Sequence, residues 1–426
     1  MLKYLMWILL VIGGFTLAWA VYEWLVPEPA DLLPTRLSGR PDDARAGGFL
    51  DAAGANLDSP VLDGNEIELL VNGVEIFPAM LEAIEAAEES VNFLTYVYWT
   101  GDIARRMAGA LTRAAERGVE VRVLLDAYGA RLMDEELIED LEAAGARVAF
   151  FHPLRWYHVR RLNNRTHRKV LVVDGRVGFT GGVGIAEEWE GDARREGEWR
   201  DDHFRVRGPV VRYLQGAFAD NWRDATGEVL AGESMFPDLE DVGSSRILAL
   251  TTSPRGDVSP IAFLYWLALH TATERVDIST PYFLPDDALL DAMRDASERG
   301  VRIRLLVPDE HNDSELVRVA SVSRYRTLLE GGIEIHEYGT SMLHAKTVLV
   351  DDRWAIVGSA NFDNRSFELN DEIVLLVEDS GFVARVRETY ARDLEAARRI
   401  TLEDVADRSW VDRVKSALAL VFREQL

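Results

Sequence analysis

Histidine and lysine recur in one pattern at two places in the chain. Each copy reads His-x-Lys, then four further residues, then Asp. The chain contains only eight histidines and four lysines, so two chance copies are not expected. Residues two apart on a strand point to the same face, where an imidazole and an ammonium can meet one phosphate. The residues of the two copies are His167, Lys169, Asp174, His344, Lys346 and Asp351.

These residue types predict phosphoryl-transfer chemistry. A neutral imidazole can attack phosphorus, and a second, protonated imidazole can give its proton to the leaving alcohol. Histidine suits both tasks because its unperturbed pKa is about 6.5. Lysines can stabilise the negative charge that develops on the phosphoryl oxygens. The alternative is two ordinary strands with exposed polar side chains, and the repetition of the pattern argues against it.

The elements that position these side chains are predicted to be short buried strands. Apolar residues follow each lysine, at 170–173 and 347–350. Asp174 and Asp351 then fall at the strand ends before a turn. We count both in the candidate catalytic set, although they are expected to brace the turns rather than touch substrate.

An internal repeat extends beyond these motifs. The segment 115–125 recurs at 297–307, 182 positions later, and the two histidines lie 177 positions apart. Apolar runs alternate with helical periods, which is typical of an α/β fold with a mixed sheet. We therefore predict two duplicated halves, residues 66–240 and 241–400, related by a pseudo-twofold axis. In the first half, strands are expected at 66–71, 91–98, 119–125 and 147–150, and helices at 77–89, 103–117 and 135–144.

The paired motifs resemble the HKD motifs of the phospholipase D superfamily, and nearly the whole chain resembles bacterial cardiolipin synthases. The resemblance also rests on Thr280-Pro-Tyr-Phe283 and on 77–84, 166–182 and 358–372. It implies two α/β/α sandwich halves sharing one active site. It also implies a two-step phosphohistidine mechanism that needs no metal and no cofactor.

The resemblance assigns roles to individual residues. His167 would be the nucleophile and His344 the general acid and then base, although the sequence itself leaves these two roles interchangeable. Each histidine needs a carboxylate on its other ring nitrogen to fix its tautomer. Matching to the family gives Glu372 as the partner of His344 and Asp201 as the partner of His167. Lys169, Lys346, Ser359 and Asn361 would bind the phosphate.

One position departs from the family pattern. Relatives often carry Asn after the first Gly-Gly, whereas this chain has Gly184. The first half therefore lacks an amide that the second half keeps in Asn361, and the site should be asymmetric.

The chain ends predict contact with a membrane. Residues 4–22 are uncharged and mostly apolar, close to the ~20 residues that cross a bilayer. We expect 1–26 to be a single-pass anchor in a bacterial cell membrane, on either side of it, followed by a linker at 27–65. A cleaved signal peptide is the alternative. An amphipathic helix at 401–426 and a basic, aromatic patch at 154–165 could also lie at a lipid surface or pack on the body.

Charge and motifs narrow the function. The net charge of -25 disfavours nucleic acid as a partner. We therefore expect phosphatidyl transfer between membrane phospholipids, with two phosphatidylglycerols giving cardiolipin and glycerol. Hydrolysis to phosphatidic acid by a phospholipase D is the second candidate, and a nuclease the third. An inactive scaffold would lack a catalytic His or Lys, and all four are present. No sequence feature specifies an oligomeric state.

Overall fold

The computed structural model describes residues 2–25, 33, 34, 37, 48–153, 164–253 and 259–406. The chain divides into two units, Met1–Ser38 and Gly39–Leu426. Most of the basic patch predicted at 154–165 lies outside the described residues. The same holds for the predicted C-terminal helix beyond Ala406, where the short helix α14 (Leu402–Ala406) ends.

The first unit contains the helix α1 (Leu2–Leu25). Its described side chains between Tyr4 and Phe15 include large apolar residues that are more than half exposed. Among the described residues, no helix has both the length and the apolarity needed to cross a membrane. The structure thus gives no support to the single-pass anchor predicted for this segment.

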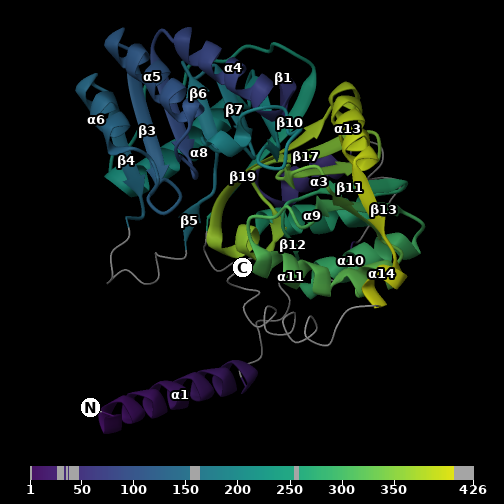
Figure 1. Ribbon diagram of the computed structural model, residues 1–426. Helices are drawn as coiled ribbons and strands as arrows, with labels where there is room; N and C mark the ends of the chain where they lie inside the picture. Colours follow the sequence, from purple (N-terminus) through teal and green to yellow (C-terminus); the bar gives the residue numbers. More distant parts are fainter. Residues whose placement is uncertain are drawn as a thin grey trace. The chain divides into compact units, whose positions relative to one another are not determined.

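The second unit is built on a large mixed sheet (Figure 1). At its centre, β1 (Leu62–Val71) pairs antiparallel with β10 (Ser245–Thr252). On the β1 side the order continues β9-β7-β6-β2-β3-β4, where β2, β3 and β4 are parallel and the other neighbours antiparallel. The bounds are β2 (Ser90–Thr95), β3 (Glu120–Asp126), β4 (Arg147–Phe151), β6 (Val170–Val173), β7 (Val177–Gly181) and β9 (Asp202–Arg207).

On the β10 side the same sequence of pairings occurs again. The order is β19-β17-β16-β11-β13-β14, with β11, β13 and β14 parallel, and β20 then pairs antiparallel with β14. The bounds are β11 (Arg275–Ser279), β13 (Arg302–Pro308), β14 (Glu334–Tyr338), β16 (Thr347–Val350), β17 (Trp354–Gly358), β19 (Asn370–Glu378) and β20 (Ala397–Ile400). The predicted mixed α/β fold is confirmed.

Helices cover both faces of the sheet (Figure 1). Apolar side chains of α4 (Asn72–Glu85) and α5 (Asp102–Glu116) form one core with β2, β3 and β6. Those of α8 (Val211–Thr226) and α13 (Ser380–Glu395) share a second core with strands of both ends of the sheet. The remaining helices are α6 (Glu135–Ala143), α9 (Pro260–Thr271), α10 (Asp287–Glu298), α11 (Glu315–Ser323) and α12 (Tyr325–Glu330).

One part of the predicted organisation differs from the structure. The linker predicted at 27–65 contains the helix α3 (Phe49–Asn56) and the start of β1. Phe49, Leu50 and Ala53 of α3 are fully buried, and the Phe49 ring packs edge-on against Trp354 at 5.2 Å. Burial of this short apolar face stabilises a helix that its Gly- and Asp-rich surroundings do not predict.

Candidate active site

Two short strand pairs link the first and second parts of the chain at the histidines. Residues 165–166 form β5, which runs parallel to β19, and the His167 N–H donates to the Asp371 carbonyl (2.9 Å). Residues 342–343 form β15, which runs parallel to β8 (Trp199–Arg200), and the His344 N–H donates to the Arg200 carbonyl (2.7 Å). Each histidine is therefore held against a strand from the other part of the chain.

This crossing decides which carboxylate meets which imidazole. His167 Nδ1 lies 2.8 Å from Glu372 Oε1, and His344 Nδ1 lies 2.7 Å from Asp201 Oδ2. The pairing predicted from the sequence, Glu372 with His344 and Asp201 with His167, is wrong. The sequence predicts that each carboxylate lies beside the histidine of its own half. Instead, β5 and β15 bring each histidine to the carboxylate of the opposite half.

The two lysines lie on the same faces as their histidines, as the spacing predicts. Lys169 Nζ donates to the His167 carbonyl (2.9 Å), and Lys346 Nζ donates to the His344 carbonyl (2.6 Å). Lys346 Nζ also lies 3.2 Å from Nε2 of the His344 ring. All four side chains are buried. The structure thus brings two ammonium groups beside two imidazoles whose Nδ1 atoms are already occupied.

Tyr96 is a site residue that the sequence analysis missed. It follows the carboxyl end of β2, and its ring lies edge-on to the His167 ring at 5.4 Å. Lys169 Nζ lies 5.7 Å from the centre of the same ring. Burial raises the Tyr96 pKa to about 12, so the phenol stays protonated. The strand predicted at 91–98 continues past Tyr96, whereas β2 ends at Thr95, at the edge where α/β folds bind ligands.

Burial lowers the pKa of both imidazoles. For His167 the pKa falls to about 4, because desolvation outweighs the opposing charge of Glu372. The His344 pKa falls well below its ordinary value for the same reason, and the charges of Lys346 and Lys169 lower it further. Both rings are therefore neutral near pH 7 in the free protein, as a nucleophilic nitrogen must be.

The same burial shifts the pKa values of the lysines and the carboxylates. It lowers the pKa of Lys169 to about 7 and that of Lys346 to about 8, against the attraction of nearby carboxylates. Burial raises the pKa of Asp201, which Lys346 partly offsets. Burial would also raise the pKa of Glu372, but His167 lowers it below its usual value. A phosphate anion entering this site would favour the charged forms of both lysines.

Histidine burial predicts a pH-dependent stability. In the unfolded chain His167 titrates at about 6.5, and in the folded protein at about 4. Between these values only the unfolded chain binds the proton, so the free energy of unfolding should fall as the pH is lowered through this window, by about 3 kcal/mol. Urea denaturation at a series of pH values measures this slope. His167→Gln should reduce this slope relative to wild type, and an unchanged slope in His167→Gln contradicts the prediction.

Ser359 and Asn361 were predicted to contact the phosphate. The Ser359 hydroxyl donates to Glu372 Oε2 (2.5 Å), so its proton is already engaged by the carboxylate that holds His167. Asn361 is buried, and its Oδ1 has no hydrogen-bond partner among the described residues. The main-chain N–H of Asn361 donates to the Ser366 hydroxyl (3.1 Å).

Gly184 stands where the family resemblance predicts Asn, and its packing gives a steric reason for the glycine. A Cβ at this position would lie 2.7 Å from the Val97 Cβ and 3.2 Å from the Trp189 ring. Close packing against these two buried side chains leaves no room for an amide.

Asp174 and Asp351 lie at the far ends of their strands from the histidines. The Asp174 carboxylate accepts main-chain N–H groups of residues 88–90, at distances down to 2.7 Å. The Asp351 carboxylate accepts those of residues 273–275 in the same way. Both residues have positive φ, 52° and 49°, at equivalent turns. Both carboxylates therefore brace turns, as their strand-end positions predict. Their inclusion in the candidate catalytic set is corrected accordingly.

Asp174→Ala should destabilise the fold without affecting chemistry. Three main-chain N–H groups lose a charged acceptor, at a cost of about 2 kcal/mol in the free energy of unfolding. Denaturant titration measures the loss, and steady-state assays on the folded fraction measure kcat. Asp351→Ala should behave alike. A hundred-fold fall in kcat with unchanged stability would show that the carboxylate does take part in catalysis.

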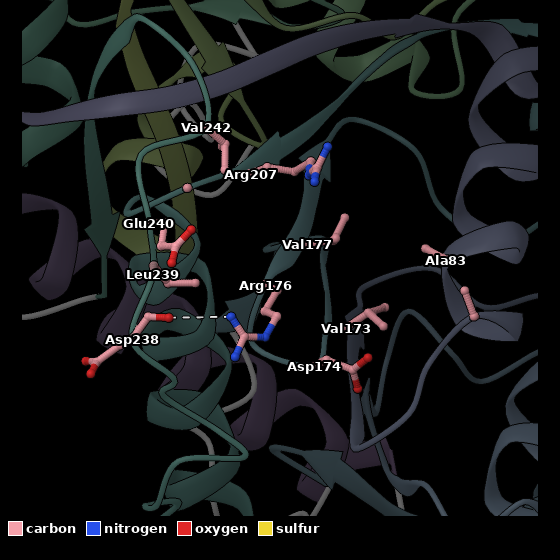
Figure 2. A pocket seen from close by; sticks show the side chains of 12 residues that line it. Ala83, Val173, Asp174, Arg176, Val177, Arg207, Asp238, Leu239, Glu240 and Val242 are labelled. Carbon is pink, nitrogen blue, oxygen red and sulfur yellow. Dashed lines mark hydrogen bonds between the residues drawn. The ribbon is translucent and has the colours of Figure 1, made fainter.

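A surface pocket of about 490 Å³ lies beside Asp174 (Figure 2). Asp174 follows the end of β6 that is farther from His167. Arg176 and Arg207 line the pocket together with Asp238 and Glu240, so its charges are mixed. Arg176 donates to the Asp238 carbonyl at 3.4 Å. The candidate chemistry thus does not sit in this pocket. In the described part of the chain, no three His, Cys, Asp or Glu side chains are grouped to hold a metal ion.

Comparison with known proteins shows several relatives. The family model described as "Cardiolipin synthase, PLD-like domain" matches residues 80–189 and 266–394. Cardiolipin synthase A of Pseudomonas putida is 36% identical over 349 residues, which cover 82% of this chain and 72% of that protein. Cardiolipin synthase 2 of Staphylococcus epidermidis is 31% identical over 358 residues, covering 83% and 73%.

A solved structure shares the fold at low sequence identity. The phosphatidylserine synthase of Haemophilus influenzae superposes with a TM-score of 0.65 at 16% identity, covering 88% of this chain and 99% of that one. Polyphosphate kinase of Porphyromonas gingivalis gives 0.53 at 15% identity, covering 84% and 53%.

Proposed function

The chain belongs to the cardiolipin synthase family with phospholipase D-like domains, and on this premise we propose that it is a phosphatidyltransferase of the cardiolipin synthase type. The observation that carries the proposal is the pair of buried imidazoles, each held through Nδ1 by a carboxylate from the opposite half, beside two buried ammonium groups. The proposed substrates are two phosphatidylglycerol molecules, and the products are cardiolipin and glycerol.

The first step forms a covalent intermediate. Because Nδ1 of His167 bonds Glu372, its free nitrogen Nε2 carries the lone pair that attacks phosphorus. The bond from phosphorus to the glycerol oxygen breaks. His344, which takes up a second proton when the phosphodiester anion binds beside it, gives that proton from Nε2 to the glycerol oxygen. The phosphatidyl group is then bonded to His167 Nε2, and free glycerol leaves.

The second step repeats the first in reverse with a different alcohol. His344 Nε2, now neutral, takes the proton from a hydroxyl of the second phosphatidylglycerol. That oxygen attacks phosphorus, the phosphorus–nitrogen bond breaks, and His167 returns to its neutral form. Asp201 supports both tasks, because a carboxylate on Nδ1 stabilises the imidazolium that forms.

The lysines supply the electrostatic part of catalysis. Lys169 and Lys346 each donate to the main-chain carbonyl of their own histidine and have further N–H donors for phosphoryl oxygens. Because burial lowers the pKa values of both lysines, binding of a phosphate anion should be accompanied by proton uptake at these amines. Asn361 is the proposed further ligand of the phosphate.

We place this activity at a lipid bilayer, because both substrates are phospholipids. The two parts of the sheet, residues 66–240 and 241–400, are proposed to descend from one duplicated unit. The repeated order of parallel and antiparallel strands on either side of β1 and β10 supports that proposal.

Radiolabelled phosphatidylglycerol in detergent micelles tests the function. Labelled cardiolipin formed by the full-length protein, and absent with His167→Ala, is the expected result. Phosphatidic acid as the sole product would mean that water is the acceptor and the protein is a phospholipase D. Formation of neither product would refute phosphatidylglycerol as donor, and phosphatidylethanolamine would be tried next.

A further inference from the structure

Asp201 and Glu372 occupy equivalent positions in the two halves. The main-chain N–H of Gly182 donates to the carbonyl just beyond Asp201 (3.1 Å). The N–H of Ser359 donates to the carbonyl just beyond Glu372 (2.9 Å). β7 pairs with β9 in the same register as β17 pairs with β19. Differences between the surroundings of the two carboxylates are therefore differences within one shared frame.

The second half fixes its carboxylate with a hydroxyl. Glu372 uses Oε1 for His167 and accepts the Ser359 hydroxyl on Oε2 at 2.5 Å. The first half has Gly182 at the position of Ser359 and so has no hydroxyl to offer. A Cβ at Gly182 would collide with the Asp201 carboxylate, so serine cannot occupy that position without a shift.

An indole occupies the corresponding role in the first half. Trp189 closes the short helix η2 (Glu187–Trp189) and is 2% exposed. Its Nε1–H donates to Asp201 Oδ2 at 2.8 Å, the same oxygen that lies 2.7 Å from His344 Nδ1. The Trp189 ring also stands edge-on to the His344 ring, 5.3 Å away at 77°. One side chain thus orients both the carboxylate and the imidazole.

We propose that Trp189 is a positioning residue for His344, and that its indole N–H does in the first half what the Ser359 hydroxyl does in the second. The proposal rests on the phosphatidyl-transfer function above, in which His344 acts as acid and then base. By holding Asp201 in place and stabilising its ionised form, Trp189 keeps the His344 proton on Nδ1 and leaves Nε2 free for the substrate oxygen.

Loss of the indole N–H has a defined direction. Burial raises the pKa of Asp201, and Lys346 and Trp189 both oppose that rise. Without the N–H, Asp201 protonates at higher pH, and while ionised it attracts the imidazolium of His344 more strongly. The second step requires neutral His344, so its rate falls on the acidic side of the pH profile. Both effects move that acidic fall in rate toward higher pH. Turnover should fall about 10-fold, the scale of the loss when a hydrogen-bond partner that orients a metal-bound histidine is removed.

The experiment replaces only the indole N–H of Trp189. Benzothienylalanine, in which sulfur replaces the indole N–H, is incorporated at position 189 of the full-length protein. The substrate is phosphatidyl-p-nitrophenol, whose leaving group needs no proton. Its burst reports formation of the intermediate at His167, and the later steady rate reports the step that uses His344. Ser359→Ala is compared, and the same analogue at Trp222, whose indole N–H donates to the distant Glu228 at 2.7 Å, is the matched control.

The position 189 variant should show a normal burst and a slower steady rate with its acidic limb at higher pH. Ser359→Ala should alter the burst, and the Trp222 variant should match wild type in both. An unmoved limb at position 189, or equal losses in both phases, overturns the positioning role. Because wild type reports the function in the same assay, a wild-type protein without a burst would instead count against the proposed function. Trp189→Phe gives the same comparison if the analogue lowers the yield of folded protein.

Discussion

Replacement of His167 by alanine is expected to lower phosphatidyl transfer by at least about 10⁴-fold, as removal of a catalytic nucleophile does in other covalent mechanisms. The loss should lie in kcat, because the lysines that would bind the phosphate remain. His344→Ala should lower transfer with natural donors as strongly, since glycerol is a poor leaving group without a proton. Steady-state assays with phosphatidylglycerol therefore cannot separate the two roles.

Phosphatidyl-p-nitrophenol separates them. With this donor, His344→Ala should release one equivalent of p-nitrophenol in a burst and then stall, because no base activates the acceptor. His167→Ala should give no burst. Acid quenching and protein-bound label from a labelled lipid provide a second readout. The opposite pattern, a burst in His167→Ala alone, would reverse the assignment of nucleophile and acid that the near-symmetry of the site leaves to experiment.

Glu372→Gln and Asp201→Asn are expected to have the next largest effects, and they test the crossed pairing. Each change keeps the side-chain shape but removes the charge that fixes an imidazole tautomer; the comparable change in a serine protease costs about 10⁴-fold. Since Glu372 bonds His167, Glu372→Gln should slow the burst. Since Asp201 bonds His344, Asp201→Asn should leave the burst and slow the steady rate.

A double-mutant comparison sharpens this test. Adding Glu372→Gln to His167→Ala should cost little more, because the carboxylate has lost the ring on which it acts. Adding it to His344→Ala should still slow the burst. If Glu372→Gln instead left the burst intact and slowed only turnover, the pairing within each half would be correct and the crossed contacts would not operate in the working enzyme. Circular dichroism of each variant controls for loss of fold, because both carboxylates are fully buried.

The sequence by itself determined the chemistry and the type of fold. His167, Lys169, His344 and Lys346 carry spacing that places each pair on one strand face, and this relation is local. The strands at 119–125 and 147–150 and the helices at 103–117 and 135–144 agree with β3, β4, α5 and α6 within about two residues, as expected for strong periodic patterns. Asp174 and Asp351 were correctly expected to brace turns, because a residue at a strand end can meet only its own turn and the neighbouring strand.

Only the tertiary structure decided which partner each catalytic side chain meets. Glu372 and Asp201 lie 205 and 143 positions from the imidazoles that they bond, and the exchange depends on β5 and β15 joining opposite parts of the sheet. Trp189 bonds Asp201 across a loop with no repeating pattern, so no residue spacing predicts this contact. Periodicity encodes which face a residue occupies, whereas contacts between distant segments depend on how whole elements pair and pack. The type of chemistry could therefore be predicted from the sequence, but the pairing of carboxylates with imidazoles could not.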